Sequence, residues 1–242
     1  MVGSLNVVMH APSAAIQALI AIGPTTVSLT TERCLPNASP HHPSFLRNIS
    51  LDTVSPSEWN THVLPYISTL TFDIACNPDV HYLSRILTSP QLPRLHTAIT
   101  TLSLSGHHWF SGVMLNRHNN PYLTTAAMLP NLQDLTFTMH TAGVTTSVYG
   151  ERRMVEIERT DPVESRARRT LRVENVVQRY GIDAVFACAA LRKVRVDYVE
   201  SELTLEHCRH GDPYGVIVEL QAYLVSGFAQ RGRTVRVDVR RA

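Results

Sequence analysis

The stretch LPNLQDLTFTMH, residues 129–140, decides the fold prediction because its pattern recurs elsewhere in the chain. A helix-like run ends in Leu-Pro, and from Leu135 onwards every second residue is apolar. Alternation with a period of two places those side chains on one face of a β-strand. The stretch therefore predicts a strand with Leu132, Leu135 and Phe137 on its buried face. Their expected counterparts on the preceding strand are Ile99, Leu102 and Leu104.

Short alternating runs of this kind recur along the whole chain. They lie at residues 25–32, 45–52, 67–75, 99–106, 132–140, 191–200 and 233–241. Segments with helical spacing separate most of them, and such alternation normally gives parallel strands joined by helical crossovers. The strand centres are roughly 20 to 60 residues apart, most often within the spacing of solenoid repeats. We therefore predict a single α/β domain over residues 1–242, a solenoid with a parallel sheet on one face and helices on the other.

The helical segments carry their own start signals. Ser13, Ser57 and Asp79 stand ahead of apolar residues that recur at helical spacing. Serine and aspartate at such positions typically accept a hydrogen bond from the first turn. We therefore expect each of the three to cap a helix.

A charged segment, residues 141–174, interrupts the repeats. It predicts an insertion with a β-ribbon around MVEIER (154–159) and a charged helix from Pro162. Arginines alternate with glutamates along it, which is typical of a solvated surface. The alternative is a binding surface for an acidic partner. The arginines that would form this surface are Arg152, Arg153, Arg166, Arg168 and Arg169.

The motif GHHWF follows one of the predicted strands directly. It places His107, His108, Trp109 and Phe110 in a strand-to-helix loop, where binding residues commonly lie. Exposed aromatic side chains there would act as anchors for a partner. The alternative is that Trp109 and Phe110 begin the core face of the next helix, with both histidines in solvent.

Three of the repeated stretches resemble a known family. LPRLHTAITTLSLSG (92–106), MLPNLQDLTFTMH (128–140) and LRKVRVDYVE (191–200) are similar to the irregular leucine-rich repeats of fungal proteins, many of which carry an N-terminal F-box. In that group a helix ends near Leu-Pro and a strand of the form L-x-x-L-x-L follows. The F-box itself is not evident before Thr25, and the asparagine ladder of regular leucine-rich repeats is missing. The resemblance implies an irregular leucine-rich-repeat-like solenoid that recognises a protein partner.

Composition and missing motifs narrow the function further. A net charge of +2 over 242 residues does not indicate a nucleic-acid or membrane partner, and no apolar run approaches membrane-spanning length. The four cysteines form no C-x-x-C pair, so we expect reduced thiols and a cytoplasmic or nuclear protein. The motifs G-x-S-x-G, G-x-G-x-x-G and G-x-x-x-x-G-K-[ST] are absent. We therefore predict no enzymatic activity and no cofactor.

The stretch HCRHGD is the sharpest candidate for a metal site. It contains His207, Cys208, His210 and Asp212, and sulfur and imidazole ligands suit zinc, which takes four ligands in a tetrahedron. No second Cys/His pair lies at a conventional distance. We therefore favour a polar loop and predict no metal.

The favoured function is non-catalytic protein recognition, by the strand face or by the loops around residues 107–110 and 141–174. One alternative is a small enzyme with a crevice at the carboxyl ends of the strands, which a reversal of strand order would create. The other is nucleic-acid binding through the arginines. The basic C-terminus, RGRTVRVDVRRA, is more typical of a charged edge strand with Val235, Val237 and Val239 inward.

Overall fold

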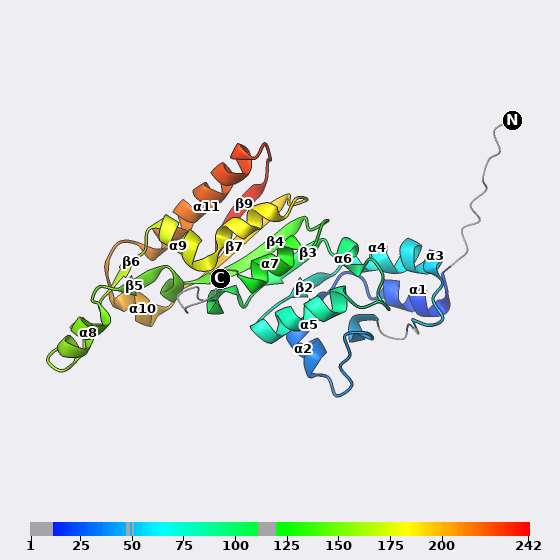
Figure 1. Cartoon of the computed structure of the whole chain (residues 1–242), viewed down its shortest axis with the longest axis horizontal. Coiled ribbons are helices and arrows are strands. Elements are labelled where there is room, and N and C mark those ends of the chain that lie inside the picture. The colour runs from blue at the N-terminus through cyan, green and yellow to red at the C-terminus, as the bar shows by residue number, and fades with distance from the viewer. Residues whose placement is uncertain (1–11, 47–48, 50, 111–119) are drawn as a thin grey trace.

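Six parallel strands form the main sheet of this protein, in a computed structural model that describes residues 12–46, 49, 51–110 and 120–242 (Figure 1). The strands are β1 (Thr26–Ser28), β2 (Thr71–Asp73), β3 (Thr101–Leu104), β4 (Asp134–His140), β7 (Lys193–Val199) and β9 (Arg236–Arg241). They lie side by side in chain order, β1-β2-β3-β4-β7-β9. All five neighbouring pairs are parallel. The predicted α/β class with a parallel sheet is confirmed.

The contact predicted for the stretch 129–140 is confirmed for two pairs of residues. Leu102 on β3 lies opposite Leu135 on β4, and Leu104 lies opposite Phe137. All four side chains are buried. A shift of the register by one residue would turn this apolar row towards the other face of the sheet.

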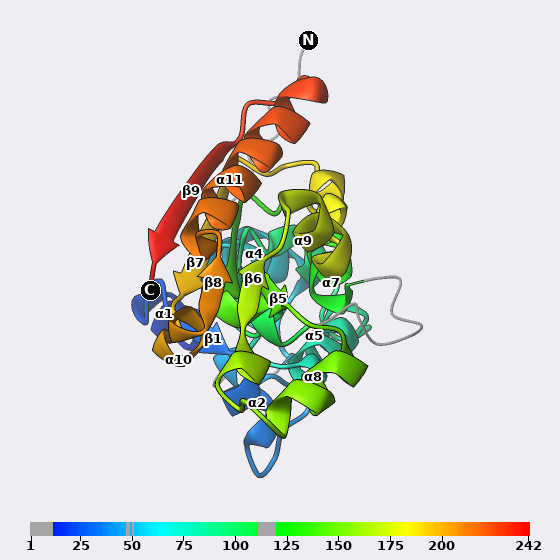
Figure 2. The ribbon, with the colours of Figure 1, turned by 90° about the vertical axis from the view of Figure 1, so that its left-hand side faces the viewer.

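Helices cover one face of the main sheet, as Figures 1 and 2 show for α5, α7 and α9. The longest helix, α11, packs against β7, β9 and α9. The α-helices are α1 (Ala14–Ala21), α2 (Leu29–Cys34), α3 (Pro56–Glu58), α4 (Leu64–Ile67), α5 (Asn77–Leu87), α6 (Leu95–Ala98), α7 (Pro121–Ala127), α8 (Glu151–Glu158), α9 (Val173–Tyr180), α10 (Glu202–Glu206) and α11 (Pro213–Gln230). Short 3-10 segments span Ser44–Leu46, His107–Trp109, Thr141–Gly143, Glu164–Arg166 and Ile182–Ala187, and a π-helical turn spans Trp59–Val63. The apolar side chains between sheet and helices form the core.

The helix starts differ in detail from the three predicted caps. Ser13 is the N-cap residue of α1, but its side chain makes no capping hydrogen bond. Ser55, not Ser57, caps α3, and it forms a reciprocal capping box with Glu58. Asp79 is the third residue of α5 and accepts a hydrogen bond from the backbone N–H of Cys76, the N-cap residue.

Two of the predicted strands are corrected by the structure. The run 25–32 forms a strand only as far as Ser28, whose hydroxyl accepts from the N–H of Thr31 and begins α2. In the run 45–52, the described residues 45 and 46 belong to the 3-10 segment Ser44–Leu46 instead of a strand. The cause is a tertiary contact, because the backbone N–H and the hydroxyl of Ser44 both donate to Glu32, at 2.8 and 2.5 Å.

A second, three-stranded sheet extends from the carboxyl end of β4. It consists of β5 (Thr145–Ser147), β6 (Arg168–Thr170) and β8 (Cys208–His210), and α8 projects from it away from the main sheet (Figure 1). The β-ribbon predicted at MVEIER is wrong, because this stretch lies mainly in α8, with Met154 and Ile157 half-buried on one side. The helix predicted from Pro162 is wrong as well. The stretch after Pro162 contains a single 3-10 turn, Glu164–Arg166. The chain then continues as β6, which pairs with β5 and so prevents a longer helix.

The C-terminal run forms the edge strand that the sequence predicts. β9 pairs with β7 alone in the main sheet. Val235 and Val237 are buried, and Val239 packs against the core. Arg236 and Arg240 are exposed on the other face.

Candidate functional site

The face of the main sheet opposite the helices carries polar side chains on all six strands. One row of facing residues consists of Thr26, Thr71, Thr101, Asp134, Lys193 and Arg236. A second row consists of Ser28, Asp73, Ser103, Thr136, Arg195 and Asp238, and a shorter third row of Thr138, Asp197 and Arg240. None of these side chains is fully buried. We call these three rows the open face.

The open face is hydroxyl-rich over β1 to β4 and charged over β7 and β9. On the hydroxyl-rich side, Asp73 accepts hydrogen bonds from the hydroxyls of Ser103 and Ser105, at 2.7 and 3.0 Å. These bonds hold two side chains of the surface in fixed positions. Fixed polar groups bind a partner with little loss of conformational freedom.

Four cations share two carboxylates on the charged side. Asp197 lies 3.2 Å from Arg195 and 3.3 Å from Arg240. Asp238 lies 2.9 Å from Arg236 and 3.9 Å from Lys193. This part of the open face therefore carries an excess of positive charge.

A pocket of about 550 Å³ lies beyond the carboxyl ends of β3, β4 and β7. Its lining comes from the segment after β3, the end of β4, the 3-10 turn Thr141–Gly143, the last turn of α9 and the end of β7. The lining residues are His108, Phe110, His140, Ala142, Gly143, Arg179, Tyr180 and Val199. We call this the carboxyl-edge pocket. The two predicted residues that line it are His108 and Phe110.

The predicted GHHWF residues differ from one another in exposure. Phe110 is buried and so is not an exposed anchor, and His107 is buried completely instead of solvated. The sequence could not predict the burial of His107, because its partner lies further along the chain. The side-chain amide of Asn120 donates to its Nε2 atom at 3.0 Å. The rings of Phe137 and Tyr180 pack against it. The side chain of Trp109 lies outside the described residues.

His108 and His140 form a pair of stacked rings at the pocket, with centroids 6.0 Å apart. His108 donates through Nδ1 to the carbonyl of Ser105, and His140 accepts at Nδ1 from the N–H of Ala142. Burial lowers the pKa of both imidazoles from the ordinary value of 6.5, and their proximity lowers that of His108 further. Both rings are therefore neutral at neutral pH.

Burial of His107 makes the stability of the protein depend on pH. Desolvation lowers the pKa of this imidazole to about 4, although the nearby backbone of Thr138 opposes the shift. The unfolded chain takes up the proton near pH 6.5, whereas the folded chain resists it until about pH 4. The contribution of His107 is therefore complete above pH 6.5, and about 3 kcal/mol of stability is lost as the pH falls through this window.

The measurement is urea unfolding of the wild type and of His107→Gln between about pH 7.5 and pH 4. The variant is expected to be less stable at neutral pH but to lose less stability on acidification. His108 and His140, whose pKa values are also lowered, remain in both proteins and act as the internal control. Equal pH slopes in the two proteins would contradict the assignment.

The arginines predicted as a binding surface do not form one cluster. Arg152 and Arg153 lie exposed on α8, Arg166 lies exposed on the 3-10 turn before β6, and Arg169 points to solvent from β6. Arg168 is half-buried. It donates from Nε to the hydroxyl of Thr145 at 2.9 Å, and it does not line the carboxyl-edge pocket.

Arg179 in the pocket was missed by the sequence analysis. Its Nη1 atom donates to the carbonyls of Gly143 and Thr145, at 3.2 and 3.4 Å. The only sequence signal was a basic residue in the last turn of a helix, which is common for reasons unrelated to ligands. Its partners lie more than thirty residues earlier in the chain.

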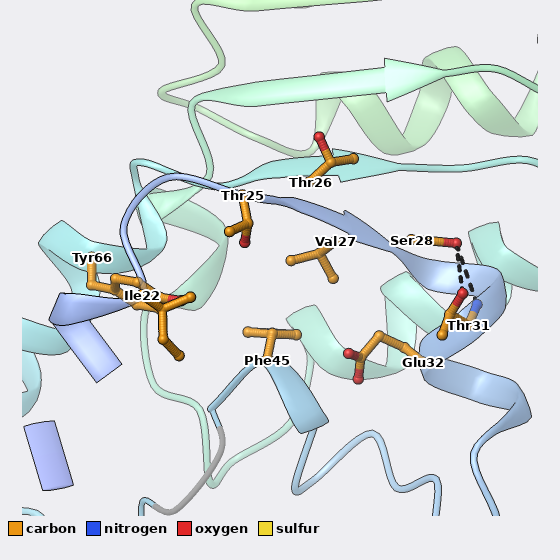
Figure 3. Close-up of a pocket in the computed structure, with 9 residues that line it drawn as sticks. All are labelled: Ile22, Thr25, Thr26, Val27, Ser28, Thr31, Glu32, Phe45 and Tyr66. Carbon is orange, nitrogen blue, oxygen red and sulfur yellow. Dashed lines mark hydrogen bonds between the residues drawn. The ribbon is translucent and has the colours of Figure 1, made fainter. Parts of the chain in front are cut away.

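A second pocket, of about 380 Å³, lies beside the edge strand β1 (Figure 3). Val27 and Phe45 contribute apolar walls. Its carboxylate, Glu32, is already bound by Ser44, and Ser28 and Thr31 bond to each other (Figure 3). The polar groups of this pocket serve the local fold, so we do not assign it a function.

The HCRHGD stretch contributes to the second sheet and to a helix start. Cys208 and His210 lie on β8, and Asp212 caps α11 by accepting from the N–H groups of Tyr214 and Gly215. Among the residues that the structure describes, no three His, Cys, Asp or Glu side chains lie close enough to hold a metal ion. No helix in the same residues has the length and apolar character needed to cross a membrane.

Comparisons of the chain with protein-family models, with curated proteins and with solved structures found no match.

Proposed function

We propose that this protein is a non-catalytic recognition module of the irregular leucine-rich-repeat type, and that it binds a protein partner on its open face. The observation that carries this proposal is the register of the main sheet. It aligns polar side chains from six strands into continuous rows that keep contact with solvent. A rigid surface of this size suits a macromolecular partner more than a small ligand.

The order of the strands supports a solenoid over a doubly wound enzyme. In a doubly wound sheet the strand order reverses, and the reversal opens the crevice in which substrates bind. Within the described residues, the main sheet runs from β1 to β9 in chain order without a reversal. Each strand therefore packs on the strand of the preceding unit, as stacked repeats do.

The charges of the open face indicate the chemistry of the partner. The excess of positive charge over β7 and β9 favours a protein surface with carboxylates at that end. The hydroxyl groups over β1 to β4 suit backbone and amide groups of the same partner. Complementary charge raises the association rate and fixes the orientation of the complex. A nucleic acid is the weaker alternative, since Asp197 and Asp238 lie among the arginines and would repel phosphates.

The four cysteines support a reducing compartment, so we propose the cytoplasm or the nucleus as the location. Cys34, Cys76, Cys188 and Cys208 are all free thiols in the structure. Proteins that fold in oxidising compartments more often join such residues in disulfides.

The test is affinity capture from lysate of the source cells, with quantitative mass spectrometry of the bound proteins. Thr136→Arg places a bulky cation in the middle of the open face, and Arg236→Glu reverses a charge at its edge. Each variant is expected to reduce the captured amount of a specific partner by roughly tenfold or more, the loss typical of a central interface residue. Arg152→Glu on α8 makes the same charge reversal far from the open face and should leave the partner bound.

Thermal unfolding of all four proteins checks that the variants are folded. The proposal is contradicted if every protein captured by the wild type is also captured by both open-face variants. It is equally contradicted if the captured protein is lost with Arg152→Glu and retained with the other two, because α8 would then be the binding surface.

A further inference from the structure

Two guanidinium groups converge on one backbone carbonyl next to the carboxyl-edge pocket. Arg179 on α9 donates to the carbonyl oxygen of Thr145 at 3.4 Å, and Arg168 on β6 donates to the same oxygen at 3.3 Å. Both side chains are half-buried. Like charges this close repel each other, and the repulsion is stronger at a partly buried site than in water.

No carboxylate of the protein neutralises this arginine pair. Every aspartate and glutamate of the chain belongs to the described residues, and among these residues neither Arg168 nor Arg179 forms an ion pair. The arrangement is unlike that of the half-buried Arg33, which binds Asp79 at 2.6 Å. Desolvation and the charge of Arg179 both lower the pKa of Arg168. The surroundings therefore leave positive charge uncompensated.

Arg233 is an arginine of the same protein whose hydrogen bonds serve only the local fold. It donates to the carbonyls of Phe186, Cys188 and Leu191 and closes the end of a 3-10 segment. Arg179 differs from it in two respects. A second guanidinium shares one of its acceptors, and its side chain lines a pocket of about 550 Å³.

Most of the other residues that line this pocket have planar rings or very small side chains. The rings of Phe110, Tyr180, His108 and His140 line it, and Ala142 and Gly143 leave room between them. Aromatic walls favour a planar apolar group, through stacking and edge-to-face contacts. A pocket of this volume lies within the range for small organic ligands. The guanidinium at the wall favours an oxyanion, which it can bind through two parallel N–H groups.

We propose that the carboxyl-edge pocket binds a small aromatic ligand that carries a carboxylate or a phosphate. The oxyanion pairs with Arg179, the charge of Arg168 adds to the attraction, and the ring lies among the four aromatic side chains. Binding removes the uncompensated charge that the protein alone does not neutralise. The pocket adjoins the end of the open face, because the facing residues His140 and Val199 follow Thr138 and Asp197 on β4 and β7. Binding of the small ligand does not require a protein partner on that face.

The experiment is calorimetric titration of the full chain with naphthoate, naphthyl phosphate and the neutral naphthamide. At least one of the two anions is expected to bind, and naphthamide should bind roughly tenfold more weakly or not at all, as expected when a charged hydrogen bond is lost. The preferred anion identifies the oxyanion as a carboxylate or a phosphate. Inorganic phosphate alone should bind more weakly than naphthyl phosphate, because it lacks the ring.

Three variants test the site itself. Arg179→Gln should weaken the anion about tenfold while naphthamide is unaffected. Ala142→Tyr fills the pocket from an exposed position without removing a hydrogen bond of the backbone, and it should abolish binding of all three probes. Arg152→Gln removes a guanidinium on α8 and is the matched control that should bind as the wild type does.

Thermal unfolding of each variant separates loss of binding from loss of the fold, and Ala142→Tyr decides the outcome if Arg179→Gln is unfolded. Equal affinity for naphthoate, naphthyl phosphate and naphthamide would overturn the proposal, because the arginines would then be structural only. Failure of all three probes to bind the wild type would overturn it as well. Anion binding that survives Ala142→Tyr would place the anion outside the pocket and contradict the assignment.

Discussion

Replacing Asp79 by alanine is expected to lower the free energy of unfolding by about 4 kcal/mol, because several donors around this buried carboxylate lose their acceptor. The Asp79 side chain is completely buried. It binds the guanidinium of Arg33 and the hydroxyl of Thr30, each at 2.6 Å. It also accepts from the backbone N–H groups of Ala75 and Cys76, which fixes the turn between β2 and α5.

Alanine at this position leaves several of these donors without an acceptor. Each unsatisfied buried donor costs about 1–3 kcal/mol, whereas Arg33 is partly exposed and can turn to water. The hydrogen bonds that lower the pKa of Asp79 act against the effect of desolvation, which raises it. The net lowering of its pKa indicates that the folded state favours the ionised form, in agreement with a stabilising role.

Urea unfolding of Asp79→Ala measures the effect, and Asp134→Ala is the matched control. Asp134 is exposed on the open face, so its replacement should change stability by less than about 0.5 kcal/mol. A loss for Asp79→Ala no larger than for Asp134→Ala would show that the network around Arg33 does not stabilise the fold.

The strands of the main sheet were predictable because their signal is local. Alternation over β4 and β7 reports directly which face is buried, and both strands contain at least three alternating buried residues. The same rule failed at residues 45–52, where the local pattern is overridden by the contact of Ser44 with Glu32. It also failed at MVEIER. There Val155 and Ile157 fit an alternating spacing, whereas Met154 and Ile157, three residues apart, fit a helical one, so such a short apolar pattern does not distinguish the two.

The candidate site was less predictable because it is assembled from distant parts of the chain. The sequence analysis predicted His108, Phe110 and Arg168 as binding residues, but no local pattern indicated that they belong to one region of the fold. The missing residues, Arg179 and His140, come from two further elements and look ordinary in sequence. Burial separates His107 from His108, although the two are neighbours, because only His107 faces Asn120 and the core.

Gly106 connects β3 to the segment that contributes His108 and Phe110, and its replacement by alanine is expected to cost about 4 kcal/mol, a large loss that a severe steric conflict can cause. The backbone of Gly106 has an ordinary negative φ of −87°. The constraint is space, because a Cβ atom there would lie 2.0 Å from the carbonyl oxygen of Ala75. The N–H of Gly106 also donates to Ile74 at 3.0 Å, so the two backbones cannot separate without losing this bond.

In Gly106→Ala, the free energy of unfolding and the affinity for the naphthyl anion that the wild type prefers should therefore both fall. The shift that relieves the clash moves the segment that forms one wall of the pocket. Gly150→Ala is the matched control: a Cβ at this exposed position meets nothing within 4 Å. Because Gly150 is the N-cap residue of α8, where alanine is less favourable than glycine, its replacement should cost about 1 kcal/mol at most. If Gly106→Ala were as stable as Gly150→Ala, the close contact between β3 and the end of β2 would be looser than the structure describes. The rigid placement of His108 and Phe110 would then lose its physical basis.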